Sequence, residues 1–256
     1  MKKIRQEMRI VYKERGLLGL IFSPIDYAIN HFLRLLFSKK TILKINAVDV
    51  YQRYDSISRK VNNNDWNIIE IGGANTALQS FLSHQHSLTI VDIDKNYIPK
   101  KCVKYYCQRT NKLPFKNDEF DCLISVATLE HIHRKERVES ISEWKRVAKK
   151  VIVYVPFGKA GKKYDQLLFS LRRMIGVPDK WTKEHITHGI PTLEELNIYF
   201  PNAKFSFIQN GNVWLITSFL TSIPVVGRIL PGLIYVILNE WDKKEPFIGC
   251  VSVWNK

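Results

Sequence analysis

The sequence predicts an α/β fold with a doubly wound, parallel sheet. From Asn67 onward, short apolar runs alternate with helical patterns, which is the order of strands and crossover helices in such sheets. The 256 residues, of which 45% are hydrophobic and 25% charged, suit one large domain with a small accessory region. The same composition excludes intrinsically disordered and low-complexity proteins.

The predicted elements follow one another along the chain. We expect strands at residues 67–71, 88–91, 103–107, 120–126 and 151–155, and helices at 76–83 and 138–148. Thr192 is followed three residues later by Glu195, a capping box that predicts a helix over residues 192–199. The last two strands are expected at residues 204–208 and 247–254.

A basic, apolar segment precedes the strands. Residues 1–60 carry 13 basic and 5 acidic side chains in a chain whose net charge is +15, which indicates an anionic partner. We therefore expect residues 1–62 to form a basic, apolar helical extension and residues 63–256 to form the main domain. Pro24, Asp26 and Arg34 interrupt the apolar part, so the helix should lie on a membrane surface or pack on the domain rather than cross a bilayer.

The most informative run is Ile68-Ile69-Glu70-Ile71-Gly72-Gly73-Ala74-Asn75. Small residues after a strand allow a ligand to approach the backbone. Asp92 ends the next predicted strand, where a carboxylate can accept both hydroxyls of a ribose. Glu70 would oppose the pyrophosphate of a dinucleotide but suits an amino group and a sulfonium. The pattern therefore favours S-adenosylmethionine over NAD as the cofactor.

Further motifs follow in order: Leu113-Pro114-Phe115, Phe120-Asp121, Leu129-Glu130-His131-Ile132, Glu143-Trp144-Lys145-Arg146-Val147, and a strand ending in Pro156. Over about residues 65–157 the chain resembles class I S-adenosylmethionine-dependent methyltransferases, in the broad subgroup with LPF…FD…LEH motifs. The resemblance implies a Rossmann-like fold. It implies that the first turn and the second-strand acid, which are Glu70, Gly72, Gly73, Asn75 and Asp92 here, bind the cofactor.

Two positions depart from the family pattern. Ala74 and Thr76 stand where the family usually has further glycines, although a related Gly-Gly-Gly-Asn-Ser variant is similar. Arg109 stands where an aspartate often accepts a hydrogen bond from the adenine amine. Adenine recognition would then fall to backbone groups or to a neighbour such as Gln108 or Asn111.

Three histidines are candidates for work on the methyl acceptor. His131, beside Glu130, would follow the fourth strand and could act as the catalytic base; the alternative is a structural histidine at a helix start. His185 and His188, in the run from Glu184 to Pro191, resemble an element of some methyltransferases linked to surface-glycan assembly and are expected to bind the substrate. A solvated turn or a structural hydrogen-bonded pair is the alternative. No metal is expected, because the run lacks a third ligand at suitable spacing.

A second apolar stretch, residues 213–239, has Arg228 as its only charge and is cut by Pro224 and Pro231. We expect a hydrophobic insert at about residues 212–241. It would cover an apolar acceptor, dip into a bilayer face, or pack against the N-terminal helix.

The predicted function is S-adenosylmethionine-dependent methyl transfer, with O-methylation of a small, lipidic or glycan acceptor near a membrane as the first hypothesis. The expected location is cytoplasmic, with peripheral attachment to an anionic membrane surface. Two alternatives stay open. The net charge favours an RNA methyltransferase, and the departures at Ala74 and Arg109 favour a non-catalytic protein that binds a membrane or a partner. The absence of Pro-Pro and Pro-Cys dipeptides argues against methylation of nucleobases.

Overall fold

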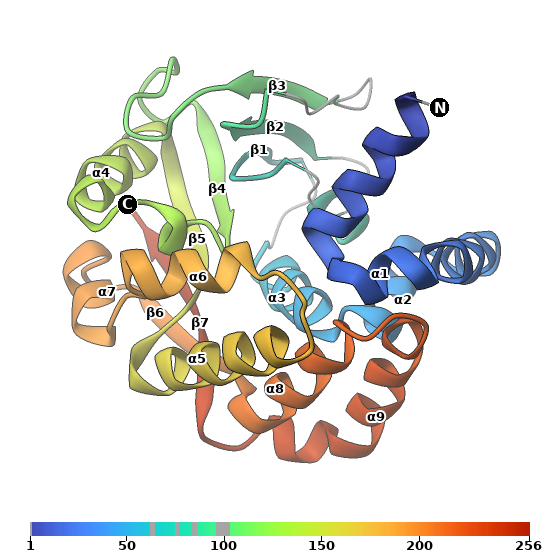
Figure 1. Ribbon diagram of the computed structural model, residues 1–256. Coiled ribbons are helices and arrows are strands. Elements are labelled where there is room, and N and C mark those ends of the chain that lie inside the picture. The colour runs from blue at the N-terminus through green and yellow to red at the C-terminus, as the bar shows by residue number, and fades with distance from the viewer. Residues whose placement is uncertain (1, 62–64, 75–76, 83–85, 96–102) are drawn as a thin grey trace. The chain divides into compact units, whose positions relative to one another are not determined.

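The computed structural model describes residues 2–61, 65–74, 77–82, 86–95 and 103–256 (Figure 1). The chain divides into two compact units. Unit 1 comprises Met1–Gln52, Ala160–Thr187 and Gln209–Phe247, and unit 2 comprises Arg53–Lys159, His188–Ile208 and Ile248–Lys256. The expected boundary between residues 62 and 63 stays a prediction.

Unit 2 is built on a seven-stranded sheet in the order β3-β2-β1-β4-β5-β7-β6. The strands are β1 (Asn67–Ile71), β2 (Ser87–Asp92), β3 (Val103–Cys107), β4 (Phe120–Val126), β5 (Ala148–Pro156), β6 (Lys204–Asn210) and β7 (Phe247–Asn255). The first five strands pair in parallel, as predicted. However, β7 pairs with β5 in the antiparallel sense, so the sheet is mixed rather than wholly parallel.

The strand register brings three strand ends together. Ile71 pairs with Val91 of β2 and with Ser125 of β4. Because these strands are parallel, the residues that follow Ile71, Asp92 and Val126 leave the sheet at the same edge, which is where ligands bind in sheets of this kind.

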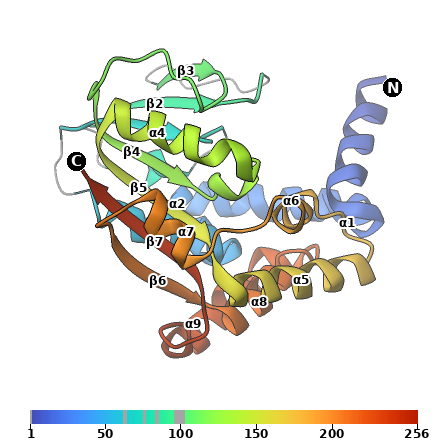
Figure 2. The ribbon, with the colours of Figure 1, turned by 90° about the vertical axis from the view of Figure 1, so that its left-hand side faces the viewer.

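The two faces of the sheet are covered by different elements. Val151, Val153 and Val155 share one buried cluster with Trp144 of α4 (Arg137–Val147) and Leu196 of α7 (Leu193–Tyr199). Figure 2 shows α4 lying across this face. Alternate residues of a strand point to opposite faces. Tyr154 accordingly lies on the other face, where the guanidinium carbon of Arg53 sits 5.1 Å from its ring centroid.

Two predicted helices differ from the observed ones. Within the described part of the expected helix at 76–83, only a short 3-10 helix, η1 (Leu78–Ser80), is present. The helix expected to end at Ala148 ends instead at Val147. Ala148 has extended backbone and already pairs with Phe120, so β5 follows α4 with no linking residue. The capping box of Thr192 and Glu195 is formed as predicted.

Unit 1 is helical. It contains α1 (Lys2–Leu36), α2 (Lys39–Asn46), α8 (Gly211–Leu220), η4 (Val226–Arg228) and α9 (Leu230–Asp242), together with most of α5 (Gly158–Met174) and α6 (Lys180–His188) and the start of α3 (Val48–Ser58). The insert expected at 212–241 is therefore α8, η4 and α9. Gly16 interrupts α1 with a φ of 68°, at a point where a Cβ atom would lie 2.2 Å from the carbonyl oxygen of Gly176.

The two apolar stretches of the sequence meet inside unit 1. The carboxylate of Asp26, in α1, is buried and accepts hydrogen bonds from the Val225 amide at 2.7 Å and the Arg228 guanidinium at 2.6 Å. The charges that interrupt the two stretches thus neutralise each other, which supports the expectation that the stretches pack together. Among the described residues, no helix combines the length and the apolar character that crossing a membrane requires.

Candidate active site

The turn after β1 is shaped by two glycines. Gly72 has a φ of 74°, and its amide donates to the Val91 carbonyl at 2.8 Å. A Cβ atom on Gly72 would lie 2.1 Å from the Thr128 hydroxyl oxygen, and one on Gly73 would lie 2.9 Å from a carboxylate oxygen of Glu70. Side chains are therefore excluded at both positions, and a bare backbone lies between β1 and the loop after β4.

Glu70 is buried beneath this turn. The hydroxyl of Tyr54, in the part of α3 that belongs to unit 2, donates to its carboxylate at 3.4 Å, and the Tyr54 ring stacks on Phe81 with 5.8 Å between the centroids. Burying a carboxylate is costly unless polar partners or a cation compensate it. The position therefore suits a cationic ligand group, as the sequence predicts for Glu70. The sequence did not predict a role for Tyr54, because no motif marks an aromatic residue in α3, the helix before β1.

Asp92 ties the end of β2 to the same turn. One carboxylate oxygen accepts from the Ala74 amide at 2.9 Å and the other from the Asp94 amide at 3.0 Å. Each oxygen of a carboxylate can accept more than one hydrogen bond, so this carboxylate keeps capacity for two ribose hydroxyls. Asn75, the remaining predicted cofactor residue, lies outside the described residues.

The loop after β4 is fixed beside the turn. The Thr128 hydroxyl donates to the Ile71 carbonyl at 3.1 Å, and it also lies 3.3 Å from the Val126 carbonyl. The 3-10 helix η2 (Leu129–His131) follows directly, so His131 leaves this loop three residues after a direct contact with β1. Thr128 precedes the quoted Leu-Glu-His motif, and nothing in the sequence distinguished it.

His188 joins His131 at this loop. A ring nitrogen of His188 hydrogen-bonds the His131 carbonyl at 3.1 Å, and its ring lies edge-on to His133 at 5.9 Å. Arg137, whose side chain is fully buried, donates to the carbonyls of Ile132 at 3.1 Å and of Gly189. Burial lowers the pKa of the Arg137 guanidinium. Arg137 thus holds the His131 and His188 segments together, a role that the sequence did not reveal.

His185 belongs to unit 1 and has a partner there. Its Nδ1 atom lies 3.0 Å from a carboxylate oxygen of Asp165, a buried residue of α5. A buried carboxylate at Nδ1 fixes the ring orientation and favours the tautomer that carries the proton on Nδ1. The predicted roles of His185 and His188 in substrate binding stay predictions.

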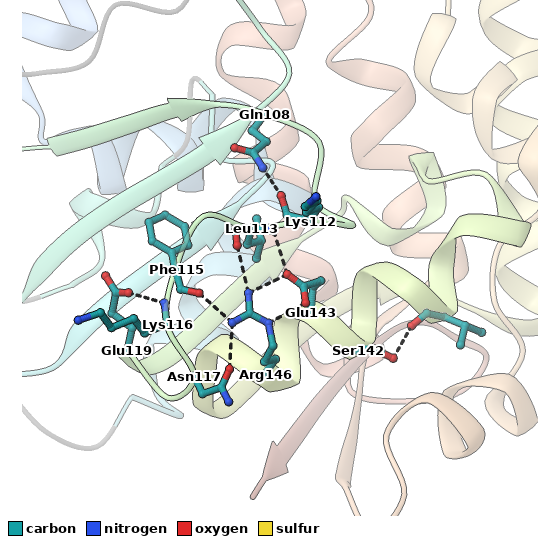
Figure 3. A network of polar contacts seen from close by, with 11 residues as sticks. Gln108, Lys112, Leu113, Phe115, Lys116, Asn117, Glu119, Ser142, Glu143 and Arg146 are labelled. Atoms are coloured by element: carbon teal, nitrogen blue, oxygen red, sulfur yellow. Dashed lines mark hydrogen bonds and ion pairs between the residues drawn. The ribbon is translucent and has the colours of Figure 1, made fainter.

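Arg146 of α4 clamps the Leu113-Pro114-Phe115 loop, as Figure 3 shows. Its guanidinium donates to the carbonyls of Phe115 at 2.8 Å and Leu113 at 3.0 Å, and Glu143 accepts from it at 2.7 Å and from the Leu113 amide at 2.9 Å. The hydrogen bond from Arg146 lowers the pKa of Glu143. The Leu113-Pro114-Phe115 motif and the motif that contains Glu143 and Arg146 are therefore held together by hydrogen bonds.

The residues considered for adenine recognition have local partners. The side-chain amide of Gln108 donates to the Lys112 carbonyl, and that of Asn111 donates to Glu139 at 3.1 Å. Arg109 lies 3.7 Å from Glu136 on the surface. Which group contacts adenine stays a prediction.

Comparison with known proteins decides what this arrangement belongs to. The family model for the methyltransferase domain matches residues 69–152, the segment that carries the turn, Asp92 and the loop after β4. This segment is a class I methyltransferase domain. No curated protein matches the chain significantly.

Solved structures share the fold of the methyltransferase. The [4+2]-cyclase SpnF is 14% identical with a TM-score of 0.53, over 80% of each chain. A candidate sarcosine dimethylglycine methyltransferase from Galdieria sulphuraria is 10% identical with a TM-score of 0.51, over 90% of this chain and 98% of that one. The MccD protein is 12% identical with a TM-score of 0.50, over 80% of this chain and 96% of that one. At these identities the likeness extends to the fold alone.

The methyl donor of this methyltransferase is S-adenosylmethionine, and the residues present fit it. The bare backbone at Gly72 and Gly73 leaves room for a ligand, the buried Glu70 suits a cationic amino acid end, and Asp92 suits a ribose.

Proposed function

We propose that this methyltransferase methylates a hydroxyl oxygen of a small, lipidic or glycan acceptor near a membrane. His131 would be the catalytic base, and His185 and His188 would bind the acceptor. The observation that carries this proposal is the hydrogen bond from Thr128 to the Ile71 carbonyl. It fixes the loop of His131 next to the turn that we expect to hold the methyl donor.

The chemistry places few demands on the protein. S-adenosylmethionine supplies an electrophilic methyl carbon on a sulfonium, and the protein mainly aligns the acceptor with it. A hydroxyl acceptor loses its proton as the new bond forms, so a base within reach accelerates the reaction. Glu70, Asp92 and the glycine turn would orient the donor, and His131 would take the proton.

The membrane context is supported by unit 1. Large apolar side chains of α1 and α9 are exposed there, including Leu17, Ile21, Leu233 and Ile237. Apolar acceptors that partition into a bilayer would be met at such a surface. We therefore propose that the protein works in the cytoplasm with peripheral attachment to a membrane.

The first test is a labelled methyl-transfer assay on lipid, glycan and RNA fractions. Labelled lipid or glycan with a base-resistant ether would support O-methylation. Label in the RNA fraction would instead favour an RNA methyltransferase, and no label in any fraction would favour a non-catalytic role.

The second test concerns His131. We expect His131→Ala to lower kcat roughly 10²- to 10⁴-fold, because the acceptor loses its base. Calorimetry should show unchanged affinity for S-adenosylmethionine. His31→Ala is the matched control, since His31 is an exposed histidine of α1 that has no part in the proposed site, and it should leave kcat near that of the wild type. A normal kcat in His131→Ala would make His131 a structural residue of the loop.

A further inference from the structure

One face of α9 carries an exposed apolar stripe. The stripe begins at Leu233 and continues three, four and eight residues later with Val236, Ile237 and Trp241. All four side chains are exposed. The exposed fraction reaches 75% for Ile237 and 63% for Trp241. Residues at this spacing share one side of a helix. We call these four residues the α9 stripe.

Other positions of α9 are fixed by packing within unit 1. A Cβ atom on Gly232 would lie 2.7 Å from the Cα atom of Ile45 and 2.8 Å from the Lys44 carbonyl oxygen, so α9 contacts the backbone of α2 directly. At the other end, the buried carboxylate of Asp242 accepts from the Asn210 amide at 3.0 Å. Both ends of α9 are therefore held within unit 1, while the four side chains of the stripe stay exposed.

A neighbouring helix of unit 1 repeats the pattern. In α1, Leu17, Ile21 and Ile25 are exposed at four-residue spacing, and Phe32 and Leu35 are exposed about two and three turns further on. Helix α1 is connected to the start of α9 through the ion pair between Asp26 and Arg228 of η4. Exposed apolar rows are thus present on two linked helices of unit 1, and single exposed apolar side chains lie on other helices of the unit, such as Met174 of α5 and Trp181 of α6.

The exposed charged side chains of unit 1 are mostly basic. Among the acids whose burial is described, only Glu240 and Glu245 are exposed; Asp26, Asp165 and Asp242 are buried, and Asp49, Asp179 and Glu184 are half-buried. Ten basic side chains of the unit are exposed: Arg34, Lys39, Lys44, Lys162, Lys163, Arg173, Lys180, Lys183, Lys243 and Lys244. The unit that carries the apolar stripe therefore exposes more bases than acids, and two of the bases, Lys243 and Lys244, directly follow α9.

We propose that the α9 stripe is the membrane-docking element of the protein and that its partner is an anionic lipid surface. The 13 residues of α9 span about 20 Å, which is shorter than a hydrocarbon core, so the helix lies in the plane of the interface. Trp241 would sit at headgroup level and Lys243 and Lys244 would lie against lipid phosphates. A second copy of the chain fits less well, because it would bring two basic surfaces together. The inference rests on the membrane context of the proposed function.

The test is vesicle flotation of the full chain without cofactor or acceptor. The probe is phosphatidylcholine vesicles with and without about 30% phosphatidylglycerol. This content gives the vesicles roughly the surface charge of an anionic membrane leaflet. We expect Ile237→Asp to weaken binding to anionic vesicles roughly tenfold or more, because a charge replaces a side chain buried in the interface. Ile198→Asp is the matched control: Ile198 is also an isoleucine on a helix, also 75% exposed, and belongs to unit 2. It should bind as the wild type does.

Three outcomes would overturn the inference. Equal binding of Ile237→Asp and Ile198→Asp would show that the stripe is not the docking surface. Equal binding of the wild type to neutral and anionic vesicles would show that anionic lipid is not the partner. A wild-type dimer in sedimentation that Ile237→Asp dissociates would assign the stripe to a second copy.

The same preparations separate this inference from the proposed function. If the wild type does not float but shows His131-dependent methyl transfer, only the docking inference is contradicted. If flotation depends on Ile237 but no methyl transfer is found, only the proposed reaction is contradicted.

Discussion

At the scale of the residue, Gly72 and Gly158 make a matched pair. Both have positive φ, at 74° and 69°, but a Cβ atom on Gly72 would strike Thr128, whereas one on Gly158 would meet nothing within 4 Å. Either change to alanine should cost about 1–2 kcal/mol of unfolding free energy for the left-handed backbone. Gly72→Ala should lose more than Gly158→Ala, because Thr128 must also move. Urea denaturation of both variants measures the difference, and equal losses would mean that the turn can relax around the new methyl group.

The sequence predicted those site residues whose role can be inferred from their own type and their position at a strand end. Glu70, Gly72 and Asp92 each stand at a strand end, where the residue type alone indicates a ligand group. Tyr54, Thr128 and Arg137 act through partners that lie far away in the chain, since Tyr54 bonds Glu70 and Thr128 bonds Ile71. Such roles depend on tertiary contacts and carry no local pattern.

At the scale of the element, the clamp between α4 and the Leu113 loop can be followed by pH. The hydrogen bond from Arg146 holds the pKa of Glu143 below its ordinary value of 4.5. A depressed carboxyl pKa contributes stability above the unfolded value, and this contribution is lost as the pH falls through the folded value. At neutral pH, Glu143→Gln should therefore be less stable than the wild type by about 1 kcal/mol, since a charge-assisted bond becomes a neutral one.

This difference should shrink as the pH falls below about 4.5, because the carboxyl then binds a proton in the unfolded chain while it is still ionised in the folded protein, and it should vanish once the pH is below the depressed folded value. Chemical denaturation between pH 3 and 7 would measure it, in an assay range chosen to span roughly the reference carboxyl pKa values. Glu139→Gln, which changes an exposed carboxylate of the same helix, is the control. A difference that stays constant across this range would show that the side-chain shape, and not its charge, maintains the clamp.

Strands were easier to predict than helices or strand direction. β1 and β4 have the predicted bounds because buried strands of a parallel sheet are short, mostly apolar runs. β3 also has the predicted bounds, although it is an edge strand whose Lys104 and Tyr106 are exposed. The direction of β7 was not predicted, since an apolar run is the same in a parallel and in an antiparallel strand. The helix expected at 76–83 is reduced to η1 in its described part, because a helical pattern of eight residues is too short to be decisive.

At the scale of the whole molecule, cofactor binding and folding should be linked. S-adenosylmethionine at 100 times its Kd should raise the unfolding free energy by about 2.7 kcal/mol, because it binds only the folded protein. Asp92→Ala removes charge-assisted acceptors and should weaken binding at least about tenfold. The same cofactor concentration should then stabilise the variant by only about 1.4 kcal/mol.

Thermal or chemical unfolding with and without cofactor tests this, and each protein's own cofactor-free value is the reference. Equal stabilisation of Asp92→Ala and the wild type would place the ribose elsewhere. The division of the chain into two units adds a second observable, because the predicted cofactor residues all lie in unit 2 and its unfolding should respond to the ligand first.

The direct junction between α4 and β5 leaves no room for inserted or deleted residues at this point of the chain. Val147 ends the helix and Ala148 already pairs with Phe120, so one inserted residue has no loop to occupy. Shifting β5 by one position would turn Val151, Val153 and Val155 away from the core that they share with Trp144. Insertions and deletions should therefore be purged at this junction during evolution. Homologues should instead vary in length between β6 and β7, where whole helices already separate the strands.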